Sequence, residues 1–257
     1  NGCLGVELAG IISELARTTL PKEFRNIDTR KAKIILVEAG PRVLSAFAKD
    51  LSDYAQKELE LLGVELHFGK PVTSCTAEGV MIGDSFVPCR TIVWAAGVEA
   101  SPAAKWLGIP ADRAGRAIVD KDLRAPGQED IFIIGDTAAV MRDDGSPVPG
   151  IAPAAKQQGA YVAKVIKAKL AGRPAPGPFR YRHQGSLATI GKSAAIIDFG
   201  WLKLKGWLAW WVWGLAHIYF LIGVRWRIAV AWSWLWIYIS RQHSARLITQ
   251  RESIRED

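Results

Sequence analysis

The segment GVELAGIISELARTTL (5–20) and the segment KIILVEAG (33–40) that follows it decide the fold. The first segment places its apolar residues at helical spacing, and we expect Pro21 to end the helix. The second is a short, nearly continuous apolar run that ends in an acid, which is typical of a buried parallel strand. A helix followed by such a strand predicts one step of a doubly wound α/β sheet.

The rest of the first 200 residues continues the alternation of helices and strands. The predicted elements are a helix at 51–62, a strand at 64–69, an antiparallel meander at 72–75, 79–82 and 85–88, buried strands at 91–98 and 130–136, a helix at 154–170 and short strands within 179–199. This order predicts a doubly wound, Rossmann-like nucleotide-binding unit with a β-meander.

The chain does not begin with Met, and Asn1-Gly2 reads as the middle of a glycine-rich loop. A strand normally precedes such a loop, so we expect the chain to be truncated at its N-terminus. Its three cysteines, Cys3, Cys75 and Cys89, form no CxxC pair. We expect them to be small buried hydrophobes in a reducing compartment.

The net charge of +8 could suggest a nucleic-acid partner, but its distribution favours a membrane surface. Residues 201–251 contain seven Lys or Arg and no acid, and nine of the 11 Trp lie between Trp201 and Trp236. Basic residues around a Trp-rich apolar stretch are typical of a protein at an anionic lipid interface. We therefore expect no nucleic-acid binding.

The apolar stretch 206–224 contains 19 residues without a formal charge, which is long enough for a membrane-spanning helix. Its Trp residues gather in one half, however, and Arg225 and Arg227 follow it directly. Trp and Arg both prefer the headgroup region. We expect residues 201–246 to lie on the membrane, with a spanning helix as the alternative.

Two acidic residues end predicted strands where nucleotide-binding proteins place polar ligands. Glu38 could accept hydrogen bonds from both ribose hydroxyls of NAD and would repel the 2′-phosphate of NADP. Arg42 lies nearby and could attract that phosphate, but we rank the repulsion by the acid as decisive. Asp136 follows Gly135 at the end of IFIIGD, and either acid could instead be an ordinary solvated strand end.

Several motifs occur together in an order and spacing that resemble one family. They are GVELAG, LVEAGPRVL, WAAGV, IFIIGD followed by VPG and APAAKQQG, and GSLATIG. The set resembles the type II, non-proton-pumping NADH:quinone oxidoreductases, within the two-dinucleotide-binding flavoprotein superfamily. The resemblance covers nearly the whole chain and implies FAD and NADH as cofactors.

The resemblance also implies a role for individual residues. Glu7 and Gln157 would be the catalytic residues, with Glu7 near the nicotinamide and flavin rings and Gln157 beside the isoalloxazine and the quinone. The cofactor-binding set would be Gly2 and Gly5 at the pyrophosphate, Glu38 at the adenosine ribose, Ala96 and Gly97 beneath the nicotinamide, Gly135 and Asp136 at the ribityl chain, and Ala155 and Gln157 at a helix N-terminus that faces the flavin. No metal site is expected.

Two departures from the family pattern affect this assignment. Asn1, Cys3 and Leu4 stand where many members have Gly, Pro and Thr, which would loosen or reshape the NADH loop. Pro153 stands where the first glutamine of the AQxAxQQG motif would be, so the chain departs from the family pattern at the implied quinone pocket.

We predict three parts: an NADH-binding domain at 1–127, the return portion of the FAD-binding domain at 128–200, and a helical membrane-binding tail at 201–257. The expected partners are membrane lipid and a membrane quinone, and the sequence allows a homodimer. The expected location is the cytoplasmic or matrix-equivalent face of an energy-transducing membrane. The alternatives are a soluble pyridine nucleotide-disulfide oxidoreductase and a catalytically incomplete membrane-binding fragment.

Overall fold

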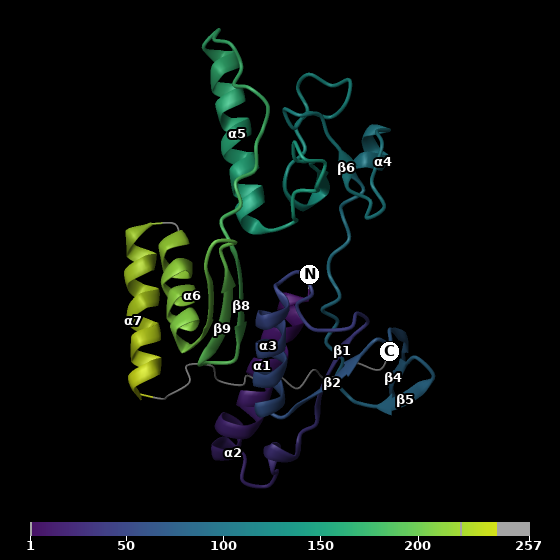
Figure 1. Cartoon of the computed structure of the whole chain (residues 1–257), viewed down its shortest axis with the longest axis vertical. Helices are drawn as coiled ribbons and strands as arrows, with labels where there is room; N and C mark the ends of the chain where they lie inside the picture. The colour runs from purple at the N-terminus through teal and green to yellow at the C-terminus, as the bar shows by residue number, and fades with distance from the viewer. Residues whose placement is uncertain (1, 222, 241–257) are drawn as a thin grey trace, which may run out of the picture. The chain divides into compact units, whose positions relative to one another are not determined.

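The computed structural model describes residues 2–221 and 223–240 (Figure 1). The chain forms two compact units. The first unit comprises Asn1–Ala95 and Ser186–Asp257, and the second comprises Ala96–Gly185. The functional division at 127 and 200 stays a prediction.

The first unit opens with one long helical segment, as the spacing of residues 5–20 predicts. It consists of α1 (Cys3–Glu14), a single π-helical turn η1 (Leu15–Thr19) and α2 (Leu20–Glu23). Pro21 does not end the helix, which corrects that expectation. Pro21 lies in the first turn of α2, where its missing N–H and fixed φ are tolerated.

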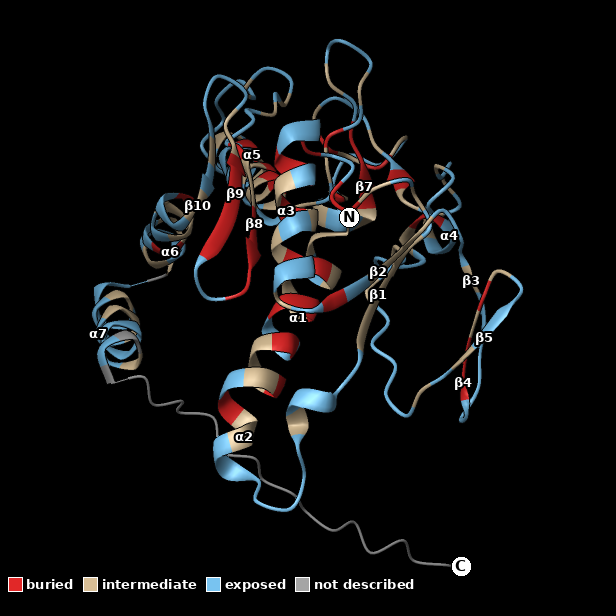
Figure 2. Cartoon of the chain, turned by 60° about the horizontal axis from the view of Figure 1, so that its bottom comes forward, coloured by how far each residue is buried: buried red, intermediate tan, exposed pale blue. Residues whose placement is uncertain are grey.

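Strands β1 (Ile34–Glu38) and β2 (Val64–Phe68) confirm the predicted parallel pair, with Ile34 opposite Val64 and Glu38 opposite Phe68. The short helix η2 (Thr29–Lys31) precedes β1, and α3 (Lys49–Leu61) connects the two strands. Buried side chains of α1 and α3 form the core with apolar residues of the sheet and of β8; they include Val6, Ala9, Leu51, Ala55 and Leu59 (Figure 2). The result is a mixed α/β, Rossmann-like arrangement.

The predicted meander is confirmed. Its strands are β3 (Val72–Cys75), β4 (Gly79–Ile82) and β5 (Ser85–Pro88), in the antiparallel order β3-β4-β5. Gly79 begins β4 because its backbone lies directly against β5. A Cβ there would be 2.3 Å from the carbonyl oxygen of Val87.

A second antiparallel sheet completes the first unit. It contains β8 (Ser186–Ile190), β9 (Ala194–Asp198) and β10 (Lys203–Gly206), and α6 (Trp207–Phe220) packs on β9 and β10. Ala195, Ile197 and Ala209 form the buried centre of that contact. Helix α7 (Val224–Ser240) lies beside α6 through parallel rings of Trp213 and Trp234, whose centroids are 5.8 Å apart (Figure 1).

The apolar stretch 206–224 does not form one continuous helix. Helix α6 ends at Phe220, so the uncharged stretch 206–224 is divided between β10, two helices and the connection between them. Within the part of the chain that the structure describes, no helix has the length and apolar character needed to cross a bilayer. Residues 241–257 of the predicted tail lie outside the described residues.

The second unit holds α4 (Ala103–Leu107), β6 (Ala117–Ile118), η3 (Gly135–Thr137), β7 (Ala138–Ala139) and the confirmed long helix α5 (Ala152–Leu170). Strands β6 and β7 pair in parallel. Its core includes Leu123, Ile133, Val140, Val148 and Ala154.

Two predicted strands are wrong. Segment 91–98 makes no strand pairing, and its large apolar side chains are 42–84% exposed. An apolar run becomes a strand only where a neighbour supplies backbone partners, and β1 and β2 pair only with each other in the described residues. In segment 130–136, Phe132 forms a single bridge to Arg124. Gly135, at φ 71°, then turns the chain into η3.

Candidate functional site

The N-terminus of α1 lies beside the carboxylate that ends β1. Gly2 is the N-cap of α1 and supplies no side chain to its free N–H groups. A Cβ on Gly2 would lie 3.3 Å from Glu38 Oε2, while Glu38 Oε1 accepts the Gly40 N–H at 2.8 Å. The structure therefore brings Gly2 and Glu38 together and fixes one carboxylate oxygen.

Gly5 lies on the side of α1 that packs against strand β1. A Cβ at this position would meet Leu36 Cδ1 at 3.5 Å and Ala95 Cβ at 3.6 Å, which is ordinary van der Waals contact. Gly5 therefore faces β1, and the free N–H groups of the helix begin one turn earlier, around Gly2. In dinucleotide-binding loops, one glycine typically lets the backbone approach the pyrophosphate and another lets the helix pack closely on the strand.

Arg42 is already engaged within its own loop. Its guanidinium donates to the carbonyl of Phe47 at 3.1 and 3.2 Å and to that of Ser45 at 3.0 Å. These bonds hold the loop in a conformation where Leu44, buried to 3% exposure, adopts φ 52°. An arginine that stabilises this turn is poorly available to a 2′-phosphate.

Glu7 is directed at the first strand of the C-terminal sheet. Its Oε1 accepts the backbone N–H of Thr189 at 3.3 Å and the Thr189 hydroxyl at 3.4 Å. Glu7 is half-buried, and within the described residues its Oε2 has no hydrogen-bond partner. The side chain is thus oriented by β8 through Oε1.

The cysteines give no evidence of a redox pair. Burial, and then the nearby Glu7 carboxylate, raise the pKa of Cys3, so its thiol stays protonated near neutral pH. Cys75 is exposed, which corrects the expectation of burial, and Cys89 is half-buried. The strand β4 separates Cys75 from the segment that holds Cys89, a spacing of roughly 9–10 Å that exceeds the span of a disulfide.

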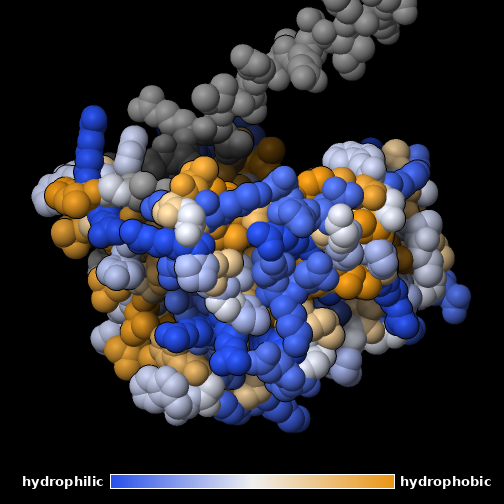
Figure 3. All heavy atoms as spheres, turned by 90° about the horizontal axis from the view of Figure 1, so that it is seen from above, coloured by the Kyte–Doolittle hydropathy of each residue, from blue (hydrophilic) through white to orange (hydrophobic). Residues whose placement is uncertain are grey.

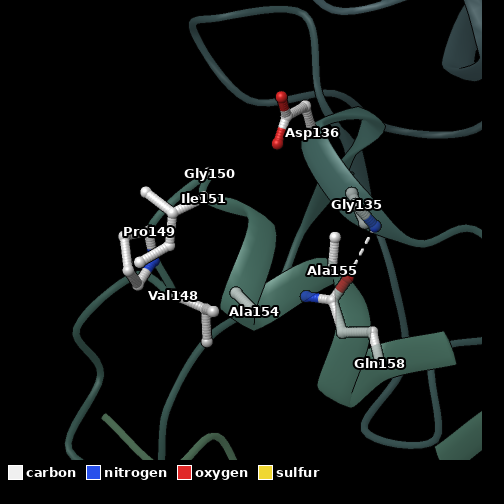
Figure 4. A pocket seen from close by; sticks show the side chains of 10 residues that line it. Gly135, Asp136, Val148, Pro149, Gly150, Ile151, Ala154, Ala155 and Gln158 are labelled. Carbon is white, nitrogen blue, oxygen red and sulfur yellow. Dashed lines mark hydrogen bonds between the residues drawn. The ribbon is translucent and has the colours of Figure 1, made fainter. Parts of the chain in front are cut away.

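In the second unit, Gly135 and Asp136 lie against the N-terminal turns of α5 (Figure 4). Together they line a hollow of about 180 Å³, open solvent included, with Ala138, Val148, Pro149, Gly150, Ile151, Ala154, Ala155 and Gln158. Gly150 allows a close approach, since a Cβ there would lie 3.4 Å from Asp136 Oδ1. The structure therefore brings together three of the predicted residues, Gly135, Asp136 and Ala155.

Gln158 also lines this hollow, although it is not among the site residues predicted from the sequence. It is 2% exposed, and its Oε1 accepts the Gly135 N–H at 2.6 Å. Helical spacing could have found it, because Gln158 follows Ala154 by four residues and therefore shares its face of α5. The predicted Gln157 points elsewhere, and its amide bonds the backbone N–H and carbonyl of Arg182, both at 2.9 Å.

Ala96 and Gly97 lie in an exposed, irregular segment at the start of the second unit. Gly97 adopts φ 113°, a value that side chains other than hydrogen rarely allow, and nothing lies within 4 Å of the position its Cβ would occupy. The local backbone is thus open to an approaching group.

Comparison with known proteins gives two family matches. The pyridine nucleotide-disulphide oxidoreductase family matches residues 1–159, and the NDH2 C-terminal domain matches residues 183–243. The structure of NDH2 from Plasmodium falciparum in complex with NADH aligns with a TM-score of 0.80 over 92% of this chain and 64% of that one. Its sequence identity of 16% supports the shared fold alone.

Curated relatives match along nearly the whole chain. A type II NADH:quinone oxidoreductase of Mycobacterium tuberculosis is 39% identical over 98% of this chain and 56% of its own length. The mitochondrial internal alternative NAD(P)H-ubiquinone oxidoreductase A1 of Arabidopsis thaliana is 30% identical over 96% of this chain and 51% of its own. The chain thus spans about half the length of these relatives. It belongs to the pyridine nucleotide-disulphide oxidoreductase family and, within it, to the type II NADH dehydrogenases.

Proposed function

We propose that the protein containing this chain oxidises NADH with a membrane quinone through bound FAD and pumps no protons. The observation that carries the proposal is the Glu38 carboxylate, fixed by Gly40 and placed beside Gly2 at the start of α1. The matches to type II NADH:quinone oxidoreductases over nearly the whole chain support the same reading.

The first unit supplies the NADH-binding residues in this proposal. Gly2 and the adjacent N–H groups of α1 accept the pyrophosphate, since a helix N-terminus favours an anion. Glu38 accepts the hydroxyls of the adenosine ribose. Because Arg42 is bonded to Ser45 and Phe47, the site favours NADH over NADPH. Residues 1–127 would form this domain, with Gly5 packing α1 on the sheet.

The second unit supplies part of the FAD site, within the proposed portion 128–200. FAD, when bound, supplies the chemistry that accepts a hydride and releases electrons. Asp136 is an exposed acceptor for ribityl hydroxyls, and Gly135, Gly150 and Ala155 keep large side chains away from the backbone beside it. The hollow encloses no space of its own, so it would border one section of the cofactor and not surround it.

The roles of four further residues stay proposals. Ala96 and Gly97 would allow the nicotinamide to approach closely, which the open space around Gly97 supports. Glu7, oriented by Thr189, would act near the reacting rings. Gln157 would reach a ligand only after its amide leaves the backbone of Arg182.

The tail would bind the membrane surface through α6 and α7. Each helix exposes an apolar stripe at helical spacing: Leu208, Trp211, Leu215 and Tyr219 on α6, and Val224, Ile228, Trp232, Leu235 and Ile239 on α7. Hydrophobic side chains also reach the surface among hydrophilic ones on the face in Figure 3. Lys203, Lys205, Arg225 and Arg227 accompany the stripes, which suits anionic headgroups.

This arrangement would place the enzyme on the cytoplasmic or matrix-equivalent face of an energy-transducing membrane, where it meets the quinone. A homodimer is compatible with the proposal. The soluble disulfide reductase alternative is disfavoured by the Trp-rich apolar helices α6 and α7, which stand where such an enzyme has its dimerisation domain.

The test is purification of the whole protein, followed by assays in proteoliposomes. We expect a flavin absorbance spectrum that NADH bleaches and a quinone restores, with no accompanying transmembrane pH change. A protein that reduces disulfides and ignores quinones would support the soluble alternative. A protein without flavin or turnover would support the incomplete fragment.

A further inference from the structure

One residue of β8 holds the carboxylate of Glu7. Glu7 Oε1 accepts two hydrogen bonds from Thr189, one from its backbone N–H at 3.3 Å and one from its hydroxyl at 3.4 Å. Strand β8 is an edge of the β10-β9-β8 sheet, so the N–H groups on its outer side need partners from outside the sheet. A bond to the N–H alone would leave the carboxylate free to swing around that atom, whereas the second bond restricts it.

Thr189 is itself fixed in place. It is 6% exposed, and the sheet around it is packed on both faces. Ala188 and Ile190 belong to the core formed with α1 and α3, while Ala195, the partner of Thr189 on β9, belongs to the core formed with α6 (Figure 2). The hydroxyl of Thr189 therefore points at Glu7 from a rigid support, as a residue that orients another one requires.

The carboxylate lies near the end of α1 that begins at the proposed NADH loop. Glu7 follows Cys3 by one helical turn, and after burial its carboxylate is the second cause that raises the pKa of the Cys3 thiol. Cys3 in turn follows Gly2, the N-cap of α1. Further along the same helix, Gly10 packs closely against the backbone of Gly191, which follows β8. Glu7 is thus held between the proposed NADH loop and β8, by two elements that pack against each other.

We propose that Thr189 is a positioning residue, whose hydroxyl holds the Glu7 carboxylate in the orientation in which Glu7 acts near the nicotinamide and flavin rings. The inference rests on the proposed function, because Glu7 has this role only if NADH reduces a bound flavin. Thr189 acts through Glu7 alone and touches neither cofactor. A purely structural Thr189 would contribute to stability and leave hydride transfer unaffected.

Two substitutions isolate the hydroxyl. Thr189→Val keeps the shape of the side chain and the backbone N–H, and Thr189→Ser keeps the hydroxyl. We expect Thr189→Val in the whole protein to slow flavin reduction by NADH about fivefold in a single turnover, because the carboxylate then samples unproductive orientations. The dissociation constant of NADH should change less than about twofold, since Glu7 is not among the residues proposed to bind the pyrophosphate or the adenosine ribose. Thr189→Ser should restore most of the rate, and Thr73→Val, at an exposed position of β3, is the matched control.

A double-mutant cycle with Glu7→Gln tests whether Thr189 acts through Glu7. Glu7→Gln should slow flavin reduction by itself. In that background, Thr189→Val should change the rate less than about twofold, because the carboxylate that it positions is already absent.

Amide hydrogen exchange gives a measurement that needs neither cofactor nor turnover. The Thr189 N–H donates to Glu7 at the open edge of β8, so its exchange in the flavin-free protein reports how firmly the carboxylate is held. After correction for intrinsic rates, this amide should exchange about fivefold faster in Thr189→Val than in the parent. The amides of β9 should be unchanged, and Thr189→Ser should match the parent.

Glu7→Asp replaces Thr189→Val if the latter does not fold. It retains the carboxylate, but the side chain is one methylene shorter and cannot keep both bonds to Thr189. We expect a similar loss of rate and of amide protection, and parental values of both would overturn the proposal.

The outcomes separate this inference from the proposed function. If NADH reduces the flavin of the parent and of Thr189→Val at the same rate, the role of Thr189 is overturned and the proposed function stands. An equal loss in the Glu7→Gln background, or parental exchange of the residue 189 amide in Thr189→Val, has the same meaning. A parent protein that NADH does not reduce would overturn the proposed function and this inference with it.

Discussion

The backbone of Gly10 on α1 lies directly against the backbone of Gly191, which follows β8. A Cβ on Gly10 would come within 2.8 Å of the Gly191 nitrogen. This contact joins the helix of the predicted NADH loop to the C-terminal sheet. Glu7 and Glu14 flank it on the same face of α1 and accept N–H groups of Thr189 and Lys192.

Gly10→Ala should therefore destabilise the protein, although alanine usually strengthens a helix interior. The added methyl meets backbone, which cannot move aside cheaply, and we expect a loss of about 1–3 kcal/mol in the free energy of unfolding. Gly159→Ala on α5 is the matched control, because its Cβ would meet only Ile134 Cδ1, at 3.8 Å. That change should raise stability by about 0.5–1 kcal/mol. Chemical denaturation of both variants checks the contrast, and equal effects would refute the close packing at Gly10.

Glu14 should make stability depend on pH. Burial raises the pKa of Glu14, and this outweighs the opposing hydrogen bond and charge of Lys192. The folded protein therefore binds this proton more tightly than the unfolded chain does. The stabilising contribution is present below the unfolded pKa and is lost as the pH rises through the folded pKa.

Gln at position 14 removes this titration and keeps an oxygen for the Lys192 N–H. We expect the melting temperature of Glu14→Gln, relative to the parent, to be higher at pH 8 than at pH 4. Glu129→Gln, at an exposed site, should show a smaller pH-dependent difference. A Glu14→Gln difference that is constant from pH 4 to pH 8 would contradict the argument.

Local patterns predicted most of the fold because they depend on neighbours in the sequence. The helices around Val6, Leu59 and Val165 and the meander all follow from spacing and turn residues. Segments 91–98 and 130–136 could not be predicted in the same way, since a strand also needs a distant backbone to pair with. The apolar composition of 91–98 indicates burial, yet Trp94 is 65% exposed.

The candidate site likewise contains residues that the sequence predicts and a residue that it does not. The acids Glu38 and Asp136 end segments whose motifs are visible in the sequence, and the structure places both beside the predicted glycines. Gln157 and Gln158 point in different directions from the axis of α5. Which of them faces the hollow also depends on where their partners Arg182 and Gly135 lie. A motif records the pair of glutamines but does not say which one faces the hollow.

Arg17 should stabilise the packing of the π-helical turn η1 against the C-terminal end of α3. It lies in the π-helical turn, donates to Ser13 Oγ at 2.6 Å and donates to the carbonyl of Gly63, just after α3, at 3.0 Å. Arg17→Lys cannot make both bonds in this geometry. We expect a loss of about 1–2 kcal/mol in unfolding free energy and faster hydrogen exchange at the C-terminal end of α3. Arg25→Met, at an exposed position, should leave both quantities unchanged, and an Arg17→Lys variant with parental exchange would exclude this role.

Glu38→Gln should relax the choice between NADH and NADPH. Gln keeps an oxygen for the Gly40 N–H, so the loop is retained, while the negative charge beside Gly2 is removed. We expect KM for NADH to rise about tenfold and kcat/KM for NADPH to increase, because a 2′-phosphate is no longer repelled. Arg42 stays bonded to its loop, so NADPH should not become the better substrate. Steady-state kinetics with both nucleotides test this, with Glu78→Gln as the exposed control, and an unchanged ratio of the two kcat/KM values would argue against Glu38 as the determinant.

The exposed tryptophans of the tail should determine binding to vesicles. Trp207 on α6 and Trp232 on α7 are 65% and 67% exposed, and an amphipathic indole is most favourable at the headgroup level. Replacing both with Ser should weaken partition onto anionic vesicles by at least tenfold, since two large apolar surfaces are lost. Trp106→Ser provides the control, because Trp106 is 74% exposed on α4 in the second unit. Flotation of the three proteins with vesicles, at low and high salt, gives the comparison. If the double variant floats as well as the parent while Trp106→Ser does not, the membrane-binding surface lies in the second unit and the tail has another partner.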